Sequence, residues 1–384
     1  MSAPEPFRWL LTGDDAYQAM LAAIDGARRS VRLETYVYTA GPLGEQFREA
    51  LINAARRGLQ VTVLVDAFGS FNLTTSFWQP LIEAGGDFRW FNPLSFRRFT
   101  FRDHRKVLIC DDDLAFVGGY NIAPEFVGDG VTKGWRDVGL RLGGDLARQL
   151  AEAFDAQFRR ADLAHELFTR FRRSTARQWR RSPEGDLLLS GPGRGRNAIK
   201  HSIMADLRKA REVSIIAAYF LPTGRLRRAL VKVARRGGRV NLVLPSKSDV
   251  PLMRLAGRAH YRRFLTAGIE VREYQPQILH SKLVLIDDAV YVGSANLDAR
   301  SLYINYELMV RMSEPGVVAG AREVFADHWR QSAAIVPATW GRSRSVWQKL
   351  QERWASILLG RLDPVFMRWQ LRGMIEAAAN RQDL

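Results

Sequence analysis

The sequence predicts an α/β fold made of two similar halves, each a mixed sheet flanked by helices. Short apolar runs rich in β-branched residues alternate with amphipathic stretches, which is typical of α/β layers. Similar blocks also recur in the same order at a nearly constant spacing. With 384 residues, 47% of them hydrophobic, the chain is long enough for more than one sizeable core.

Buried strands are predicted where the apolar runs fall, at residues 31–38, 61–66, 213–220 and 240–244. Helices are predicted at 43–57 and 224–236, each ending in Arg-Arg-Gly. A glycine after a basic last turn is a common helix stop.

Three blocks establish the repeat. Residues 31–36 parallel 213–219, residues 55–65 parallel 234–244, and residues 103–109 parallel 279–285. Because the offset stays near roughly 180 residues, the pattern indicates a duplication and a pseudo-twofold pair of domains. We predict a first domain at 1–165, a basic linker at 166–186, a second domain at 187–333 and a basic, Trp-rich amphipathic tail at 334–384.

The chain is strongly basic, with 57 Lys and Arg against 40 Asp and Glu and a formal charge of +17. Such a surface attracts polyanions, either nucleic acid or an anionic membrane face. A generally basic surface that reflects a preference for arginine is the alternative. The single cysteine, Cys110, excludes an intramolecular disulfide and suits a reducing compartment.

No stretch reaches the roughly 18 apolar residues that span a bilayer, and the N-terminus lacks the pattern of a secretory signal. We therefore expect a protein that is cytoplasmic or lies on a membrane.

The candidate chemistry lies in two copies of one motif. Each copy has a histidine, a lysine two residues later, an aspartate five residues after the lysine, and an asparagine in a turn of small residues. The copies are His104, Lys106, Asp111 and Asn121, and then His280, Lys282, Asp287 and Asn296. Alternation along a strand would place each histidine and lysine on one face. Two complete copies argue against the alternative that these are histidines of the core.

These residue types fit attack on a phosphodiester. Lysine and asparagine side chains neutralise the phosphate oxygens, one imidazole attacks phosphorus, and the other donates and accepts the proton. We predict that an acidic residue orients each ring, Asp137 that of His104 and Glu307 that of His280, since each follows its motif in the same order.

The two motif aspartates are less clearly catalytic. Asp111 and Asp287 are candidates for the site, but a role in forming a turn fits them equally well. No acidic or histidine cluster suits a divalent metal, so we predict no metal and no other cofactor.

The paired motifs resemble those of the phospholipase D superfamily, over roughly residues 1–330. The resemblance implies that both motifs meet in one site between the halves and that the reaction passes through a phosphohistidine without a metal. It also implies His104 as nucleophile and His280 as acid and base, an order that the residues alone leave open.

Within that superfamily the chain is most similar to bacterial cardiolipin synthases, of the shorter type B without N-terminal transmembrane helices. The similarity lies in residues 33–38, 118–122, 218–222 and 293–298. It implies transfer of a phosphatidyl group from phosphatidylglycerol to the headgroup hydroxyl of a second phospholipid, giving cardiolipin and glycerol. We expect a peripheral enzyme on the cytoplasmic face of the cell membrane, with phospholipid and an anionic membrane surface as partners and no nucleic acid.

The tail supports a membrane partner. Trp340, Trp347 and Trp354 recur every seven residues, so they are predicted to share one helix face with Leu350 and Leu358. A basic helix with such a face is typical of membrane interfaces, although packing on its own domain would give the same pattern.

Two other functions remain possible on the sequence. A nuclease or other phosphodiesterase of the same superfamily would use the same chemistry, and the charge would suit DNA. A binding module with relic motifs is the third possibility, and the completeness of both motifs argues against it.

Overall fold

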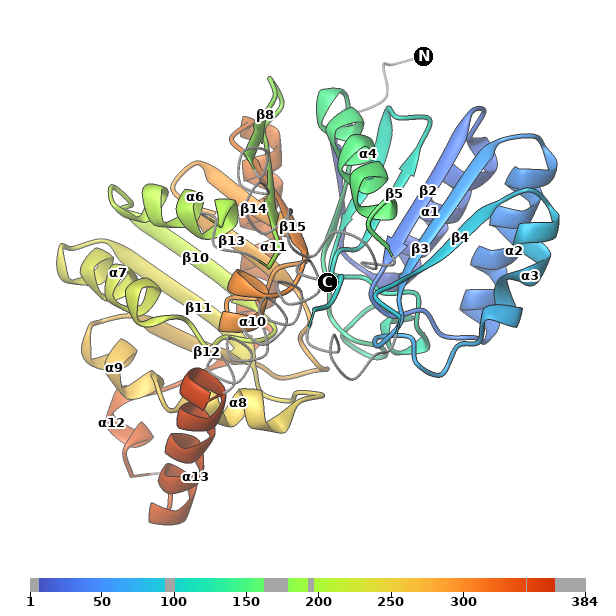
Figure 1. Cartoon of the computed structure of the whole chain (residues 1–384). Coiled ribbons are helices and arrows are strands. Elements are labelled where there is room, and N and C mark those ends of the chain that lie inside the picture. Colours follow the sequence, from blue (N-terminus) through green and yellow to red (C-terminus); the bar gives the residue numbers. More distant parts are fainter. Residues whose placement is uncertain (1–6, 94–100, 162–178, 193–196, 343, 363–384) are drawn as a thin grey trace, which may run out of the picture.

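The computed structural model describes residues 7–93, 101–161, 179–192, 197–342 and 344–362. It consists of two α/β halves, each with one sheet (Figure 1).

The first half contains a seven-stranded sheet of order β1-β7-β6-β5-β2-β3-β4. Its strands are β1 (Phe7–Leu10), β2 (Ser30–Thr35), β3 (Gln60–Asp66), β4 (Asp87–Phe91), β5 (Val107–Cys110), β6 (Leu114–Gly118) and β7 (Gly139–Gly143). Its helices are α1 (Gly13–Gly26), α2 (Pro42–Arg56), α3 (Gln79–Glu83) and α4 (Asp145–Phe158), with 3-10 turns η1 (Thr75–Trp78) and η2 (Pro124–Phe126).

The second half contains a nine-stranded sheet of order β16-β12-β11-β10-β13-β14-β15-β9-β8. Its strands are β8 (Trp179–Arg181), β9 (Asp186–Ser190), β10 (Glu212–Ala217), β11 (Arg239–Pro245), β12 (Glu270–Tyr274), β13 (Lys282–Ile286), β14 (Ala289–Gly293), β15 (Glu307–Met312) and β16 (Ser332–Ala334). Its helices are α6 (Ala198–Leu207), α7 (Gly224–Arg235), α8 (Pro251–Arg258), α9 (Tyr261–Thr266), α10 (Ala299–Tyr303), α11 (Pro315–Arg330), α12 (Pro337–Trp340) and α13 (Val346–Ile357), followed by a π-helical turn η3 (Leu358–Leu362).

The strand orders confirm the predicted α/β fold and its duplication. Without its edge strands β8 and β16, the second sheet has the order of the first, with β10, β11 and β12 in the places of β2, β3 and β4. In each half those three strands are parallel and the remaining pairs are antiparallel. The motif strands β5 and β13 take equivalent central positions beside β2 and β10.

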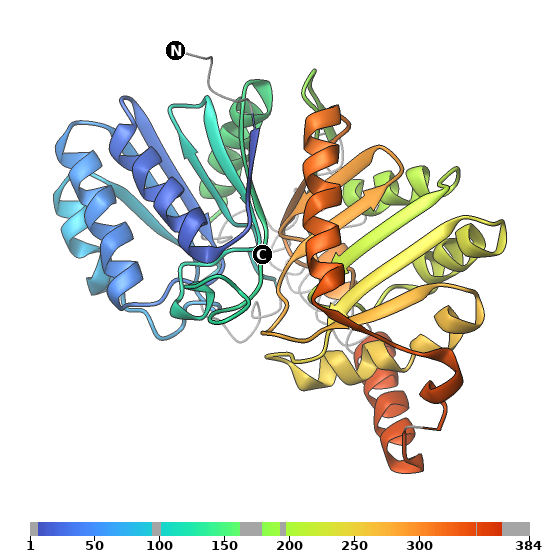
Figure 2. The ribbon, with the colours of Figure 1, turned by 180° about the vertical axis from the view of Figure 1, so that it is seen from behind.

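The layers explain why the central strands are buried along their whole length. Helices α1 and α2 cover the outer face of the first sheet, and α6 and α7 cover that of the second. The inner faces share one hydrophobic core with α4 and α11, and Figure 2 shows α11 beside the junction of the halves. A strand covered on both faces has little contact with water, and β2 and β13 are buried at every position, including the charged residues Arg32, Glu34 and Lys282.

The predicted strands and helices agree with the observed ones to within a few residues. The predicted helix stops are confirmed, because Gly58 (φ 87°) and Gly237 (φ 89°) adopt the left-handed conformation just beyond α2 and α7.

The prediction of one tryptophan face in the tail is wrong for Trp340. That residue ends α12 and packs at 5.2 Å between ring centroids on Tyr261 of the second domain. A new helix, α13, begins after Ser345, whose side chain forms a capping box with Gln348. The remaining tryptophans, Trp347 and Trp354, therefore belong to a separate helix.

Most of the predicted linker lies outside the described residues. Its last part includes β8, which pairs with β9 at the edge of the second sheet. The domain boundaries themselves stay a prediction.

Candidate active site

The two motifs meet because each half pairs its backbone with the other. The His104 N–H donates to the Tyr306 carbonyl at 2.9 Å, and the His280 N–H donates to the Arg136 carbonyl at 2.7 Å. Isolated parallel bridges join Asp103 to Tyr306 and Arg136 to Leu279. Each motif thus lies beside a segment of the opposite half.

This pairing decides which carboxylate reaches which histidine. Tyr306 precedes Glu307 and Arg136 precedes Asp137, so His104 Nδ1 lies 3.0 Å from Glu307 Oε2, and His280 Nδ1 lies 2.6 Å from Asp137 Oδ2. Our prediction that Asp137 orients His104 and Glu307 orients His280 is wrong. The carboxylates are exchanged between the halves.

The exchanged pairs fix both tautomers. An ionised carboxylate can only accept, so Nδ1 of His104 and of His280 carries the proton that is donated to it. Although burial raises the pKa of Asp137, the nearby Lys282 and His280 lower it overall. The pKa of Glu307 is likewise lowered despite burial, chiefly by His104. Each ring is left with an unprotonated Nε2 that can attack or accept a proton.

The surroundings of both histidines favour the neutral ring. Burial lowers the pKa of His104 against the opposing effect of Glu307. Burial and the neighbouring Lys282 lower the pKa of His280 to about 4, more strongly than Asp137 raises it. A phosphodiester anion between the motifs would raise both values again.

The motif lysines share this site. Lys106 Nζ donates to the His104 carbonyl at 2.6 Å, and Lys282 Nζ donates to the His280 carbonyl and lies 2.8 Å from His280 Nδ1. Burial lowers the pKa of both ammonium groups, that of Lys106 to about 7, and Glu307 opposes the shift in each. The positive charge of Lys282 also lowers the pKa of Lys106, so the lysines of the two motifs lie close enough to act on one bound phosphate.

Both motif asparagines are buried. Asn121 Oδ1 accepts the Val37 N–H at 3.0 Å, which orients its amide. The side-chain oxygen of Asn296 is buried and has no hydrogen-bond partner among the described residues.

The small-residue turns of the two motifs differ at one position, which is Gly119 in the first motif and Ser294 in the second. Each residue suits the carboxylate that lies beside it, Asp137 and Glu307 respectively. Ser294 donates through its hydroxyl to Glu307 Oε2 at 2.5 Å. The equivalent Gly119 has no such donor, and a Cβ there would lie 2.3 Å from each oxygen of Asp137. Glycine is required because the Asp137 carboxylate occupies that space.

The structure does not bring Asp111 and Asp287 to the site, so their inclusion there is wrong. Both follow their strands with left-handed backbone, φ 59° and 49°. The Asp111 carboxylate accepts from the N–H groups of residues 28, 29 and 30, and that of Asp287 accepts from those of residues 211 and 212. Asp111 thereby links the turn after β5 to the beginning of β2, and Asp287 links the turn after β13 to the beginning of β10.

Several contributors to the site were not predicted. Tyr36 packs against the His104 ring at 4.9 Å between centroids, and Phe126 and Trp135 pack against the His280 ring at 5.0 and 5.6 Å. Aromatic residues after a strand were visible in the sequence, but nothing there indicated that they enclose the histidines.

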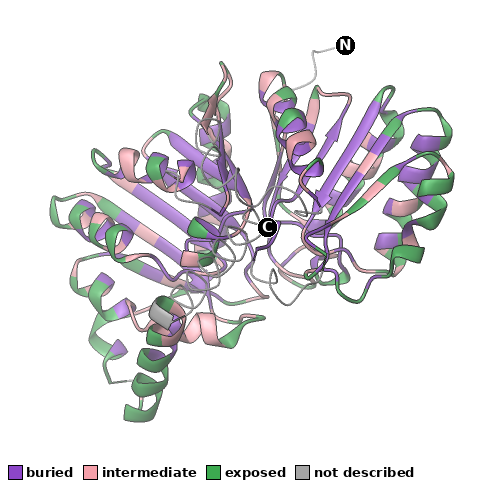
Figure 3. Ribbon diagram, in the orientation of Figure 1, coloured by how far each residue is buried: buried purple, intermediate pink, exposed green. Residues whose placement is uncertain are grey.

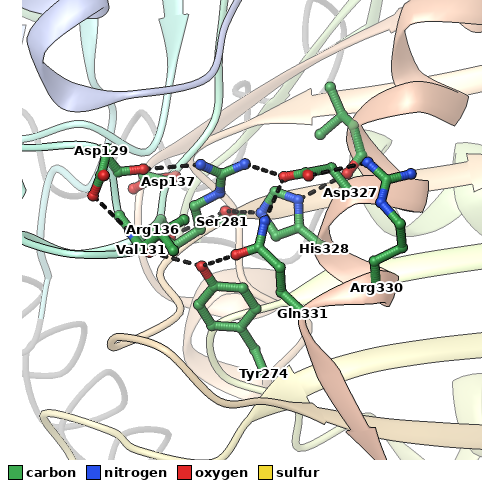
Figure 4. A network of polar contacts seen from close by, with 12 residues as sticks. Asp129, Val131, Arg136, Asp137, Tyr274, Ser281, Asp327, His328, Arg330 and Gln331 are labelled. Atoms are coloured by element: carbon green, nitrogen blue, oxygen red, sulfur yellow. Dashed lines mark hydrogen bonds and ion pairs between the residues drawn. The ribbon is translucent and has the colours of Figure 1, made fainter.

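A polar network behind His280 also crosses between the halves (Figure 4). Arg136 pairs with Asp327 at 2.5 Å and donates to the Asp129 carbonyl at 2.9 Å. The Ser281 hydroxyl lies 3.0 Å from the Arg136 carbonyl and 3.2 Å from His328 Nε2. The network fixes the Arg136 backbone, which in turn positions His280 and Asp137.

Metal-binding clusters and membrane-spanning helices are both absent from the described ranges. No group of three or more His, Cys, Asp or Glu side chains is arranged there to hold a metal ion. Of the helices in the same ranges, none is both long and apolar enough to cross a lipid bilayer.

A two-motif site of this kind, between halves of this topology, is what the phospholipase D resemblance implies. The family model described as "Cardiolipin synthase, PLD-like domain" matches residues 20–130 and 203–329. Cardiolipin synthase B of Escherichia coli K12 is 34% identical over 310 residues, 78% of this chain and 75% of that protein. Cardiolipin synthase 2 of Bacillus anthracis is 31% identical over 335 residues, 85% of this chain. The chain spans 65% of the length of that Bacillus relative.

Two solved structures share the fold. Phosphatidylserine synthase from Haemophilus influenzae Rd KW20 superposes with a TM-score of 0.72 at 13% identity, over 94% of this chain and 93% of that one. Polyphosphate kinase from Porphyromonas gingivalis gives 0.59 at 15% identity, over 88% and 50%. The chain belongs to the PLD-like family of cardiolipin synthases.

Anion binding is expected to take up protons. At pH 7 a lysine whose pKa is about 7, as for Lys106, is half protonated, and an anion beside it raises that pKa. Tungstate binding at pH 7 should therefore take up roughly half a proton or more, and its affinity should fall as pH rises above 7. Calorimetry in buffers of different ionisation enthalpy measures this uptake. Lys106→Met should reduce it and the surface variant Lys349→Met should not; uptake unaltered in Lys106→Met would contradict the assignment.

Asp111→Ala is expected to affect stability and not chemistry. The variant loses acceptors for three backbone N–H groups at a left-handed turn, so the free energy of unfolding in urea should fall by about 1–2 kcal/mol. Its turnover should stay near that of the wild type. Asp113→Ala, an exposed neighbour, is the matched control and should change neither quantity. A large loss of turnover at full stability would return Asp111 to the active site.

Proposed function

We propose that the protein is a cardiolipin synthase that transfers a phosphatidyl group from phosphatidylglycerol to the headgroup hydroxyl of a second phospholipid. The observation that carries the proposal is the pair of His–Lys motifs in one site, each histidine held by a carboxylate of the other half. Membership in the family supports the choice of lipid.

In the first half-reaction, Nε2 of His104 attacks phosphorus. A bond forms between that nitrogen and phosphorus, and the bond from phosphorus to the glycerol headgroup oxygen breaks. His280, protonated at Nε2 in the presence of the anion, gives its proton to the leaving oxygen, and glycerol departs. Lys106 and Lys282 stabilise the charge on the phosphoryl oxygens, assisted by the motif asparagines.

The second half-reaction reverses the roles. The acceptor hydroxyl gives its proton to Nε2 of His280 as its oxygen bonds to phosphorus, and the bond from phosphorus to His104 breaks. The exchanged carboxylates stabilise the positive charge on each ring in turn, Glu307 on His104 and Asp137 on His280. With phosphatidylglycerol as acceptor, the products balance as cardiolipin and glycerol.

The substrate defines the partners and the place of action. Phosphatidylglycerol is an anionic bilayer lipid, so the protein would work as a peripheral protein on an anionic membrane. A net charge of +17 favours that surface. We place it on the cytoplasmic face, consistent with a single cysteine that is buried and unpaired.

Product analysis tests the function. Purified protein is incubated with phosphatidylglycerol vesicles without added metal, and the lipids and glycerol are quantified. The proposal expects equal amounts of cardiolipin and glycerol. Phosphatidic acid alone would make the protein a hydrolase, and an unchanged lipid pool would direct attention to nucleic acid or another phosphodiester.

Trapping of the covalent intermediate tests which of the two histidines is the nucleophile. His104→Asn should reduce turnover by about 10³-fold or more and form no covalent adduct, because the nucleophile is gone. His280→Asn should retain attack and accumulate an adduct, detected by intact mass as a phosphatidyl group that acid releases. His201→Asn, outside the site, is the control. An adduct in His104→Asn would reverse the two roles.

A further inference from the structure

Helix α13 presents an apolar stripe to the outside of the molecule. The side chains of Val346 (74% exposed), Trp347 (68%), Leu350 (53%), Trp354 (61%) and Ile357 (43%) form it. At 3.6 residues per turn they fall within an arc of about 100° on one face. We call these five residues the α13 stripe.

The opposite face of α13 is occupied. Ala355 is fully buried in a small core with Ala256 of α8 and Leu221. Glu352 is also buried and forms an ion pair with Arg344. Figure 3 shows the buried and exposed sides of the helix. Because one face is anchored in the second domain, the stripe has a fixed outward orientation.

The anchor connects α13 to the edge of the active site. Helix α8 follows β11 through a loop that contains Asp249, and Asp249 accepts a hydrogen bond from the Tyr219 hydroxyl at 2.5 Å. Tyr219 comes two residues after Ala217, which lies opposite Lys282 in the β10–β13 pair. In both Figure 1 and Figure 2, α8 lies between α13 and the first half. Helix α13 thus packs on α8, and the loop before α8 is hydrogen-bonded to Tyr219 near the motif strand β13.

Two exposed apolar side chains also lie on the first half. Phe68 and Phe71, both exposed, follow the end of β3, the strand equivalent to β11. The Arg102 guanidinium lies over the Phe68 ring at 4.7 Å, two residues before His104. The first half thus also exposes apolar side chains, in contact with the residues that precede its motif.

The charges around the stripe identify its partner. Lys349 and Arg353 are exposed and form one edge of the stripe, whereas the single acidic residue of α13, Glu352, is buried. The exposed charges of this helix are all positive, so a second copy would offer them no counter-charge through the same face. An anionic bilayer offers both an apolar layer and negative headgroups, and tryptophan is favoured at its interface.

We propose that the α13 stripe inserts into the interface of an anionic phospholipid bilayer and holds the active-site edge against the membrane. The inference rests on the proposed function only in that the substrate is a bilayer lipid. It assigns the contact to one helix face of this chain.

Binding to vesicles tests the inference. The variant Trp347→Ser/Leu350→Ser/Trp354→Ser is compared with the wild type on vesicles with and without phosphatidylglycerol. We expect the triple variant to partition about tenfold or more weakly onto the anionic vesicles. The control Ile82→Ser removes an exposed apolar side chain of α3 on the first half and should leave binding unchanged. Wild-type tryptophan emission should shift to the blue on binding, and brominated lipids should quench it.

Kinetics separates this inference from the proposed function. With short-chain phosphatidylglycerol dispersed as monomers, the triple variant should match the wild type, whereas on vesicles its turnover should fall with its binding. If the wild type fails on both substrates, the proposed function fails, while the binding comparison still decides the role of the stripe. Unchanged vesicle binding by the triple variant would overturn the inference, because another occupant, such as a second copy or residues 363–384, would then cover the stripe.

Discussion

The structure of the site depends on the exchange of carboxylates between the halves. Neither half contains a complete His–carboxylate pair, since His104 needs Glu307 and His280 needs Asp137. The exchange follows from backbone pairing, in which Tyr306 and Arg136 each bond to a motif of the opposite half. The orientation of both histidines therefore depends on the association of the two halves.

Duplication has left the two sides of the site similar but unequal. Ser294 assists Glu307 on one side, and Gly119 makes room for Asp137 on the other. The network around Arg136 supports His280, whereas His104 lies beside Tyr36. In the mechanism that we propose, such differences distinguish the histidine that attacks from the one that moves the proton, although both come from the same motif.

Much of the fold could be predicted because its signals are local. Apolar β-branched runs gave the central strands, and the glycines at 58 and 237 gave the helix ends. The motif histidines, lysines and asparagines also followed from spacing. The partners of the histidines did not, because order along the chain suggested one acid for each half, and only the bridges of Tyr306 and Arg136 reveal the exchange. The aspartates of the motif were misassigned since the pattern that marks catalysis also marks a turn.

The exchange can be tested directly by NMR of the ring nitrogens in protein labelled with ¹⁵N-histidine, with His104→Gln and His280→Gln used for assignment. The account predicts that Asp137→Asn alters the Nδ1 resonance of His280 and leaves that of His104 nearly unchanged, and that Glu307→Gln does the reverse. A change at His104 in Asp137→Asn, with His280 unaffected, would contradict the exchanged arrangement and restore one carboxylate to each half.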